Sequence, residues 1–146
     1  MKKTLIALTV ACASLLTAPS FAQTAMAQDA LYKTFGEKAG LVKLMDDFVN
    51  RLKADSRTGP HFKDANPRNL KEQLVDQVCQ VTGGPCVYQG SDMKSAHSGM
   101  DIKTSDFNAL VEVMQQAMDA QGIPFQAQNQ LLAKLAPMHR DIISVK

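Results

Sequence analysis

The chain contains three histidines, His61, His97 and His139, and the imidazole ring is the side chain that most often binds transition metals. His97 lies in the stretch DMKSAHSGM at residues 92–100, where its neighbours are small, polar or methionine. Two interpretations of His97 are open at this point. It is either a metal ligand or a solvated histidine on a short helix.

Two cysteines, Cys79 and Cys86, are separated by QVTGGP, whose turn-forming residues bring the two sulfurs towards each other. In an oxidising compartment this spacing favours a disulfide, and two separately buried thiols are the alternative. The four-ligand spacing of zinc sites is absent from the sequence. The CxxCH motif that attaches c-type haem is also absent.

The N-terminus is typical of a secretory signal peptide. Lys2 and Lys3 precede the apolar run TLIALTVACASLLTA, and small-x-small sequences end at Ala22 and Ala27. We therefore expect residues 1–27 to act as a signal peptide that is cleaved after Ala22 or Ala27, and the protein to be periplasmic or secreted. A membrane anchor is the alternative, but the apolar run is short for a span of about 20 residues.

Removal of this segment changes the charge balance. The full chain has 16 basic and 14 acidic residues, and without Lys2 and Lys3 the basic residues also number 14. A domain with balanced charge has no general attraction for nucleic acid or for anionic membranes. We therefore expect the mature domain, residues 28–146, to have no nucleic-acid partner and no stable membrane association.

The apolar residues of the mature chain follow a helical period almost throughout, so helices are expected to position His97. Pro67 at a first turn and Thr82-Gly83-Gly84-Pro85 after the last one predict a helix over 67–81. A further stripe predicts a helix over 39–53. The region 55–69 is expected to be a long polar loop, and a very short helix is expected close to His97.

Two more helices are predicted near the C-terminus. One covers 105–121, with Thr104 or Ser105 as its N-cap and Gly122 as its stop. The other starts near Pro124 and is kinked at Pro137. An alternating strand pattern of useful length does not occur, so the predicted fold class is all-α.

The order of these features resembles the truncated globins of group I. LYKTFG at 31–36 is similar to the family's opening segment, DDFVNRL at 46–52 to its second helix, and HF at 61–62 to the aromatic corner. LKEQL, TGGP and Tyr88-Gln89-Gly90 resemble the distal helix and its loop, DMKSAHSGM the proximal segment, and DFNALV and LAPMHRDI the long C-terminal helices. Each motif is weak alone. Their order and spacing over residues 29–143 carry the resemblance.

The resemblance implies a two-over-two helical sandwich around haem b, iron protoporphyrin IX, with His97 as the proximal iron ligand. A neutral imidazole suits haem iron, and we expect a nearby backbone carbonyl to bind its other ring nitrogen. By the same matching of positions, eight residues are expected to contact the cofactor: Phe62, Leu70, Gln73, Leu74, Met93, Ile102, Phe107 and Leu110.

The distal side departs from the family's pattern. Many group I members carry a tyrosine directly after the phenylalanine of DDF, where this chain has Val49, and glutamines where it has Leu70 and Leu74. Gln73 lies one turn from Leu70 and shares its face. We therefore predict a mainly apolar distal pocket that includes Val49, with Gln73 as the only near hydrogen-bond donor, and a preference for CO or NO over O₂.

The remaining two histidines carry weaker hypotheses. His61 neighbours Phe62 and is a second distal candidate, but it is expected to face solvent, so we expect five-coordinate or water-bound iron. His139 lies where some relatives bond a histidine to a haem vinyl group, and an ordinary helix histidine is the alternative.

The function expected from these observations is reversible binding of a diatomic gas, O₂, NO or CO, by an exported haem b protein. It would serve oxygen binding, oxygen transport or gas handling, with an unknown reductase as redox partner. A haem enzyme is the alternative, either an NO dioxygenase or a peroxidase-like protein. A helical interaction module without haem is a third reading, and the presence of both His97 and Phe62 argues against it.

Overall fold

The computed structural model describes residues 29–145, and the predicted signal peptide, residues 1–27, lies outside them. The helices are α2 (Ala30–Thr34), α3 (Glu37–Ala54), α4 (Gly59–Phe62), α5 (Pro67–Val81), α6 (Met93–Ala96), α7 (Thr104–Ala120), α8 (Phe125–Leu135) and α9 (His139–Ile142), with a 3₁₀ turn η1 (Ala136–Met138) before α9. Within the described part, strand-like pairing is limited to one parallel bridge between Lys103 and Val145. The all-α prediction is confirmed.

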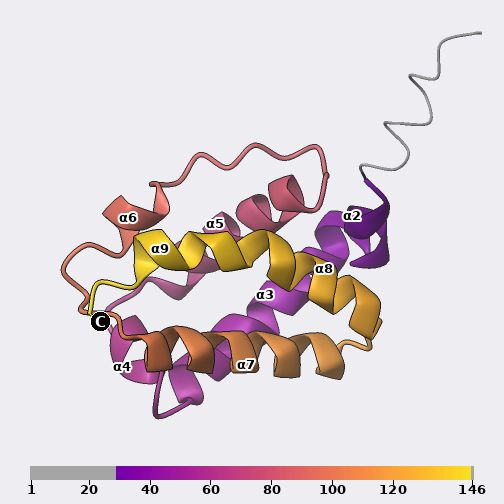
Figure 1. The fold of residues 1–146 in the computed structure, drawn as a ribbon. Coiled ribbons are helices and arrows are strands. Elements are labelled where there is room, and N and C mark those ends of the chain that lie inside the picture. The colour runs from indigo at the N-terminus through magenta and orange to yellow at the C-terminus, as the bar shows by residue number, and fades with distance from the viewer. Residues whose placement is uncertain (1–28, 146) are drawn as a thin grey trace, which may run out of the picture.

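Two pairs of helices form the body of the molecule. Helix α3 contacts α5 and α7, and α8 contacts α2, α5 and α7. In Figure 1, α7 and the α8–α9 run lie in front of α3 and α5. This is the two-over-two arrangement that the resemblance to the truncated globins implies. Among residues 29–145, the structure contains no helix that combines the length and the apolar character needed to cross a membrane.

The core is built on one face of α3. Its buried residues recur every three or four positions, which is the spacing of a single helical face. This face packs against apolar side chains of α5 and α7, and burial of such a face contributes more to helix stability than intrinsic propensity does. The buried residues of α3 are Gly40, Leu41, Leu44, Met45, Phe48, Val49 and Leu52.

The bounds of α5 agree with the sequence prediction. Asn66 caps the helix, because its side-chain oxygen accepts hydrogen bonds from the backbone N–H groups of Arg68 (3.0 Å) and Asn69 (3.3 Å). Pro67 follows as the first helical residue. After the last turn Gly83 takes a left-handed conformation with φ 87°, which favours glycine and ends the helix.

The start of α7 was predicted one residue too late. Helix α7 begins at Thr104 with Lys103 as its N-cap, so the N-cap prediction of Thr104 or Ser105 was wrong. The reason is Asp106, whose carboxylate accepts a hydrogen bond from the Lys103 backbone N–H at 2.9 Å. This contact makes Lys103, the residue before Thr104, the N-cap of α7.

Two further predictions have different outcomes. The kink at Pro137 is confirmed, because α8 gives way to η1 at Ala136 and the helix resumes as α9 at His139. The prediction of a long loop over 55–69 was wrong, because α4 occupies Gly59–Phe62 within this region. A helix of one turn is too short to produce a periodic apolar pattern.

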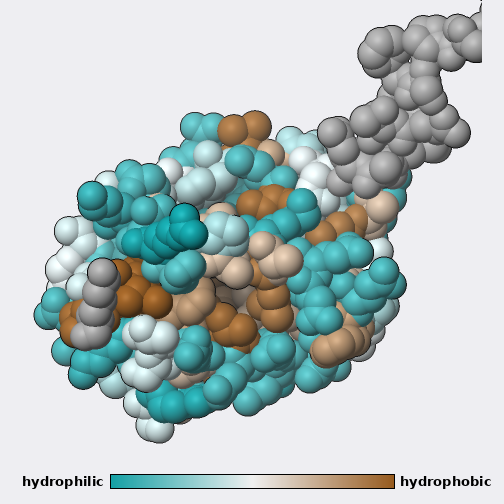
Figure 2. Space-filling view, viewed as in Figure 1, coloured by the Kyte–Doolittle hydropathy of each residue, from teal (hydrophilic) through white to brown (hydrophobic). Residues whose placement is uncertain are grey.

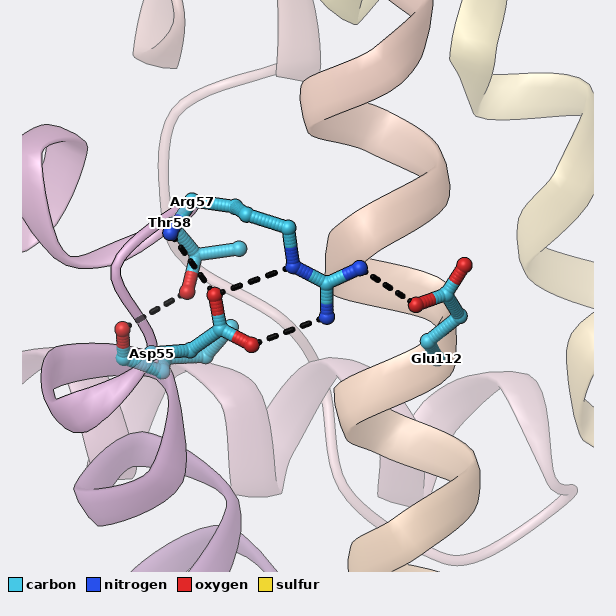
Figure 3. Close-up of polar contacts among 5 residues, drawn as sticks. Asp55, Arg57, Thr58 and Glu112 are labelled. Atoms are coloured by element: carbon cyan, nitrogen blue, oxygen red, sulfur yellow. Dashed lines mark hydrogen bonds and ion pairs between the residues drawn. The ribbon is translucent and has the colours of Figure 1, made fainter.

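The corner between α3 and α4 is fixed to α7 by a polar cluster (Figure 3). The Arg57 guanidinium bonds to both carboxylate oxygens of Asp55, at 3.2 and 2.9 Å, and to Glu112 of α7 at 2.5 Å. The buried Thr58 hydroxyl donates to the Leu52 carbonyl at 2.7 Å. These contacts set the direction in which α4 leaves α3, and α4 carries His61 and Phe62.

Candidate functional site

A cavity of about 400 Å³ lies between the helices. Its volume falls in the range of sites that hold a small molecule or cofactor. Figure 2 shows hydrophobic residues gathered around a hollow in the face where the α8–α9 run and α7 lie side by side. The lining residues come from α3 to α9 and are mostly apolar.

His97 directly follows α6 and lines this cavity. The Asp92 carboxylate caps α6, accepting from the Ser95 backbone N–H at 2.9 Å and from the Ser95 hydroxyl at 2.7 Å. The His97 Nδ1 atom lies 2.8 Å from the Met93 carbonyl oxygen, one helical turn earlier. Since a carbonyl only accepts, Nδ1 carries the hydrogen and the Nε2 lone pair stays free for a metal. The expected backbone partner of His97 is therefore present.

All the residues that were predicted to contact the cofactor line the cavity. Most of their side chains are only half-buried although they lie inside the molecule, because they face the cavity instead of packed protein. An apolar wall that is incompletely covered by protein fits a flat apolar group such as a porphyrin. These residues are Phe62, Leu70, Gln73, Leu74, Met93, Ile102, Phe107 and Leu110.

Val49 is the exception among the predicted distal residues. Its side chain is fully buried, but it does not belong to the cavity wall. Phe48 and Leu52 of the same helix line the cavity instead. They lie four residues apart on one face of α3, whereas Val49 is rotated by about 100° from Phe48. The position that relatives fill with tyrosine is therefore turned into the protein core here.

His61 lies at the edge of the cavity where α4 approaches the start of α7. The ring is half-buried and does not face solvent as expected, and its Nε2 lies 3.5 Å from an Asp106 carboxylate oxygen. The pKa of Asp106 lies below its usual range mainly because the carboxylate accepts from the Lys103 N–H, and proximity to His61 lowers it further. His61 is thus paired with a carboxylate.

Three polar side chains lie along the cavity wall near α5. The Gln77 amide nitrogen contacts the sulfurs of Met93 at 3.5 Å and Met138 at 3.7 Å. The Tyr88 hydroxyl donates to the Ser91 carbonyl at 2.8 Å, and burial raises the pKa of the Tyr88 phenol. Within residues 29–145, the Gln73 side chain makes no hydrogen bond. Of these three side chains, Gln73 is thus the one whose amide has no hydrogen-bond partner among the described residues.

Sequence reasoning missed part of the cavity wall. Gln77 gave no separate signal, and Tyr88 was noted only as part of a family motif. Most of the other missed residues belong to apolar helical stripes, which do not distinguish a cavity wall from a packed core. The missed apolar residues are Phe48, Leu52, Ala65, Val78, Ala96, Met100, Val111, Met114, Leu132, Leu135, Ala136, Met138 and Ile142.

His139 lies outside the cavity wall, although its neighbour Met138 belongs to it. The side chain is exposed, and its Nδ1 is 2.8 Å from the Ala136 carbonyl oxygen. The ring packs against Phe107, with 6.3 Å between ring centroids. The predicted bond between His139 and a haem vinyl group stays a prediction.

Cys79 and Cys86 form a disulfide in the structure, with 5.7 Å between their Cα atoms. Cys79 belongs to the last turn of α5 and has no exposed surface, whereas Cys86 lies in the following loop and is half-buried. The bridge therefore ties the loop that leads to α6 to the core of the protein.

Comparison with known proteins identifies the family of this chain. The family model of the bacterial-like globins matches residues 30–144. A group 1 truncated hemoglobin of Mycolicibacterium paratuberculosis is 28% identical over 112 residues, which is 77% of this chain and 82% of the relative. A group 1 truncated hemoglobin of Tetrahymena thermophila is 28% identical over 96 residues, 66% of this chain and 79% of the relative.

A solved structure has the same fold. The Fe(III) form of the truncated hemoglobin from Tetrahymena pyriformis superposes with a TM-score of 0.75 at 23% identity, covering 77% of this chain and 97% of that chain. The chain therefore belongs to the bacterial-like globins, as a truncated globin of group I, a family whose cofactor is haem b.

Proposed function

We propose that this chain is exported, holds haem b through His97, and reversibly binds a diatomic gas between the cofactor and α5, in oxygen binding, transport or gas handling. When bound, haem would supply an iron atom that can coordinate both the His97 imidazole and a diatomic gas. One observation carries the proposal. The contact between His97 Nδ1 and the Met93 carbonyl leaves the Nε2 of a cavity-lining imidazole free.

The proximal residues hold the imidazole in a defined orientation. Asp92 caps the single turn of α6, and Met93 supplies both the carbonyl that binds His97 and a side chain of the cavity wall. A hydrogen bond from Nδ1 fixes the tautomer and the orientation of the ring. His97 therefore presents an oriented Nε2 lone pair as iron ligand.

The distal residues set the polarity at the gas. Leu70 and Leu74 are cavity-lining and apolar, so they exclude water from the space next to α5. Gln73 lies on the same helix face, and its amide has no partner among the described residues. It is thus the side chain that remains available to donate a hydrogen bond to a bound gas.

Two features support export. Residues 1–27 have the pattern of a signal peptide. The Cys79–Cys86 disulfide suits an oxidising compartment, because cytosolic thiols are kept reduced. N-terminal sequencing of the protein from a periplasmic or culture-medium fraction tests this part, and an intact Met1 in the cytosolic fraction would contradict it.

The haem assignment is tested by absorption spectra of purified residues 28–146 after haem addition, dithionite reduction and CO. The matched variants are His97→Ala and His139→Ala, because both rings bond a backbone carbonyl through Nδ1 but only His97 lines the cavity. We expect wild type and His139→Ala to give the same Soret bands. His97→Ala should give an altered ferrous band that added imidazole restores.

Each outcome of these spectra has a definite meaning. A wild-type protein without a Soret band would refute haem binding, and an unaltered His97→Ala spectrum would refute ligation by His97. Mixing the reduced, O₂-equilibrated protein with NO and measuring nitrate separates the two functional classes. Stoichiometric nitrate formation would favour the NO dioxygenase alternative over a carrier.

A further inference from the structure

The short helix that carries His97 has little support of its own. Helix α6 is four residues long and buries none of them. A single turn is not stable in isolation, because nucleating a helix costs more than one turn recovers. Of the other helices, α9 is the one that α6 contacts most closely. The position of α6 therefore depends on its contacts with neighbouring helices and on the chain segment that leads into it.

That segment is the loop at 82–92, which runs back along the molecule from the end of α5 to α6 (Figure 1). Beyond the backbone hydrogen bonds of the helix end, it is attached to the last turn of α5 at two places. Cys86 is bonded to Cys79, and the Tyr88 backbone N–H donates to the side-chain oxygen of Gln80 at 2.6 Å. Cys79 is part of the hydrophobic core, so the first attachment is anchored to packed protein.

The attachments continue without a break to α6. The Tyr88 hydroxyl donates to the Ser91 carbonyl at 2.8 Å, which joins the second attachment point to the residue before the N-cap. Asp92 then caps α6. A path of bonded contacts therefore leads from the core through the loop to the helix whose Met93 carbonyl orients His97.

The loop also packs closely against the distal helix. A Cβ atom at Gly90 would overlap the Tyr88 hydroxyl and the side-chain oxygen of Gln73, so a larger residue there would require the ends of these side chains to move. Tyr88 and Gln73 both line the cavity. Displacing this loop would thus disturb the cavity wall as well as the helix that carries His97.

We propose that the Cys79–Cys86 disulfide and the Gln80 side chain act as a clamp that positions α6, so that His97 stays aligned with the iron and haem is retained. The disulfide and Gln80 are positioning elements, because neither contacts the cavity. The inference rests on the proposed haem ligation by His97. It adds that the proximal ligand is controlled from the C-terminal end of the distal helix.

The test uses holoprotein variants that open each attachment separately. Cys86→Ser opens the bridge and leaves the buried Cys79 in place. Gln80→Leu removes the acceptor for the Tyr88 N–H, and Gln80→Glu keeps it. Gln89→Leu is the matched control, because Gln89 is an exposed residue of the same loop without a side-chain hydrogen bond among the described residues.

Two measurements report the effect of each substitution. The rate of haem transfer to excess apomyoglobin reports haem retention, and the iron–histidine stretching band of the ferrous protein reports the alignment of His97. We expect haem loss to rise about tenfold or more for Cys86→Ser. For Gln80→Leu we expect the rate of haem loss to rise about fivefold, which corresponds to the loss of one hydrogen bond. Both variants should shift or broaden the band. Gln80→Glu and Gln89→Leu should match wild type in both readouts.

The outcomes separate the clamp from the proposed function. If wild type takes up haem and Gln80→Leu loses it at the wild-type rate with an unshifted band, the role of Gln80 is refuted. The same result for Cys86→Ser refutes the role of the disulfide. If wild type takes up no haem, the proposed function itself fails. Gln80 is exposed, so Gln80→Leu remains informative even if Cys86→Ser does not fold.

Discussion

Gln73 is the residue on which O₂ retention is expected to depend most. The two other polar side chains that line the cavity near α5 have their donors engaged: Gln77 by the Met93 and Met138 sulfurs, and Tyr88 by the Ser91 carbonyl. The Gln73 amide has no such partner within residues 29–145. Substitution by leucine removes the donor and keeps a side chain of similar size.

The size of the effect follows from one neutral hydrogen bond. Its net contribution is about 0.5–1.5 kcal/mol. A loss of that size corresponds to about a 2- to 13-fold increase in the rate of O₂ release, since 1.4 kcal/mol is tenfold. CO gains less from a donor than O₂ does. The rate of CO release should therefore change by a smaller factor, and the ratio of the two rates should shift towards CO.

Stopped-flow measurement of O₂ release from the reduced protein tests this prediction. Gln77→Leu is the control, because Gln77 is one turn along α5 and lines the same cavity, but its amide contacts methionine sulfur. We expect Gln77→Leu to stay within about twofold of wild type, since weak contacts to sulfur contribute little. The reasoning fails if Gln73→Leu releases O₂ at the wild-type rate, or if both variants accelerate release equally.

Two further predictions concern the corner between α3 and α4. Hydrogen bonds from Arg57 lower the pKa of Asp55 from 3.8 to about 2, so their contribution to stability is present above pH 4 and is lost as the pH falls towards 2. Thermal unfolding of Arg57→Gln should show a lower Tm than wild type at pH 6 and a much smaller difference near pH 2; a gap that is independent of pH would contradict this. Thr58→Val removes the buried donor to the Leu52 carbonyl, so urea unfolding should show a loss of about 1–3 kcal/mol, with Thr58→Ser close to wild type. Equal stability of the Val and Ser variants would contradict that assignment.

Local signals explain why some elements were predictable from the sequence. The bounds of α5 follow from Pro67 at its start and glycine after its end, and both act through the backbone of their own turn. The partner of His97 was predictable for the same reason, because Met93 lies one helical turn before it. A contact between residues four positions apart is a feature of one helical turn, so its partners can be read from the sequence spacing.

The cavity wall depends on tertiary packing and was only partly predictable. Residues such as Leu135 and Met138 repeat with the period of a core-facing helix, and the sequence contains no sign of the cofactor that completes their surroundings. Val49 illustrates the reverse case. Its position in a motif predicted the cavity, but the rotation of α3 that buries it is set by packing against α5 and α7.

The loop before α6 contains both a local contact and a tertiary contact. Its role therefore emerged only from the structure. The turn between Cys79 and Cys86 is a local signal, so the sequence predicted the disulfide. The bond between Gln80 and the Tyr88 N–H joins a helix residue to an irregular loop, and such contacts follow no period. Yet that bond, rather than the disulfide alone, continues the connection through Tyr88 and Ser91 to the helix of His97. The alignment of the proximal ligand thus depends on a contact whose sequence signature is a single glutamine, and this is why the Gln80→Leu and Gln80→Glu pair is the sharper test of the clamp.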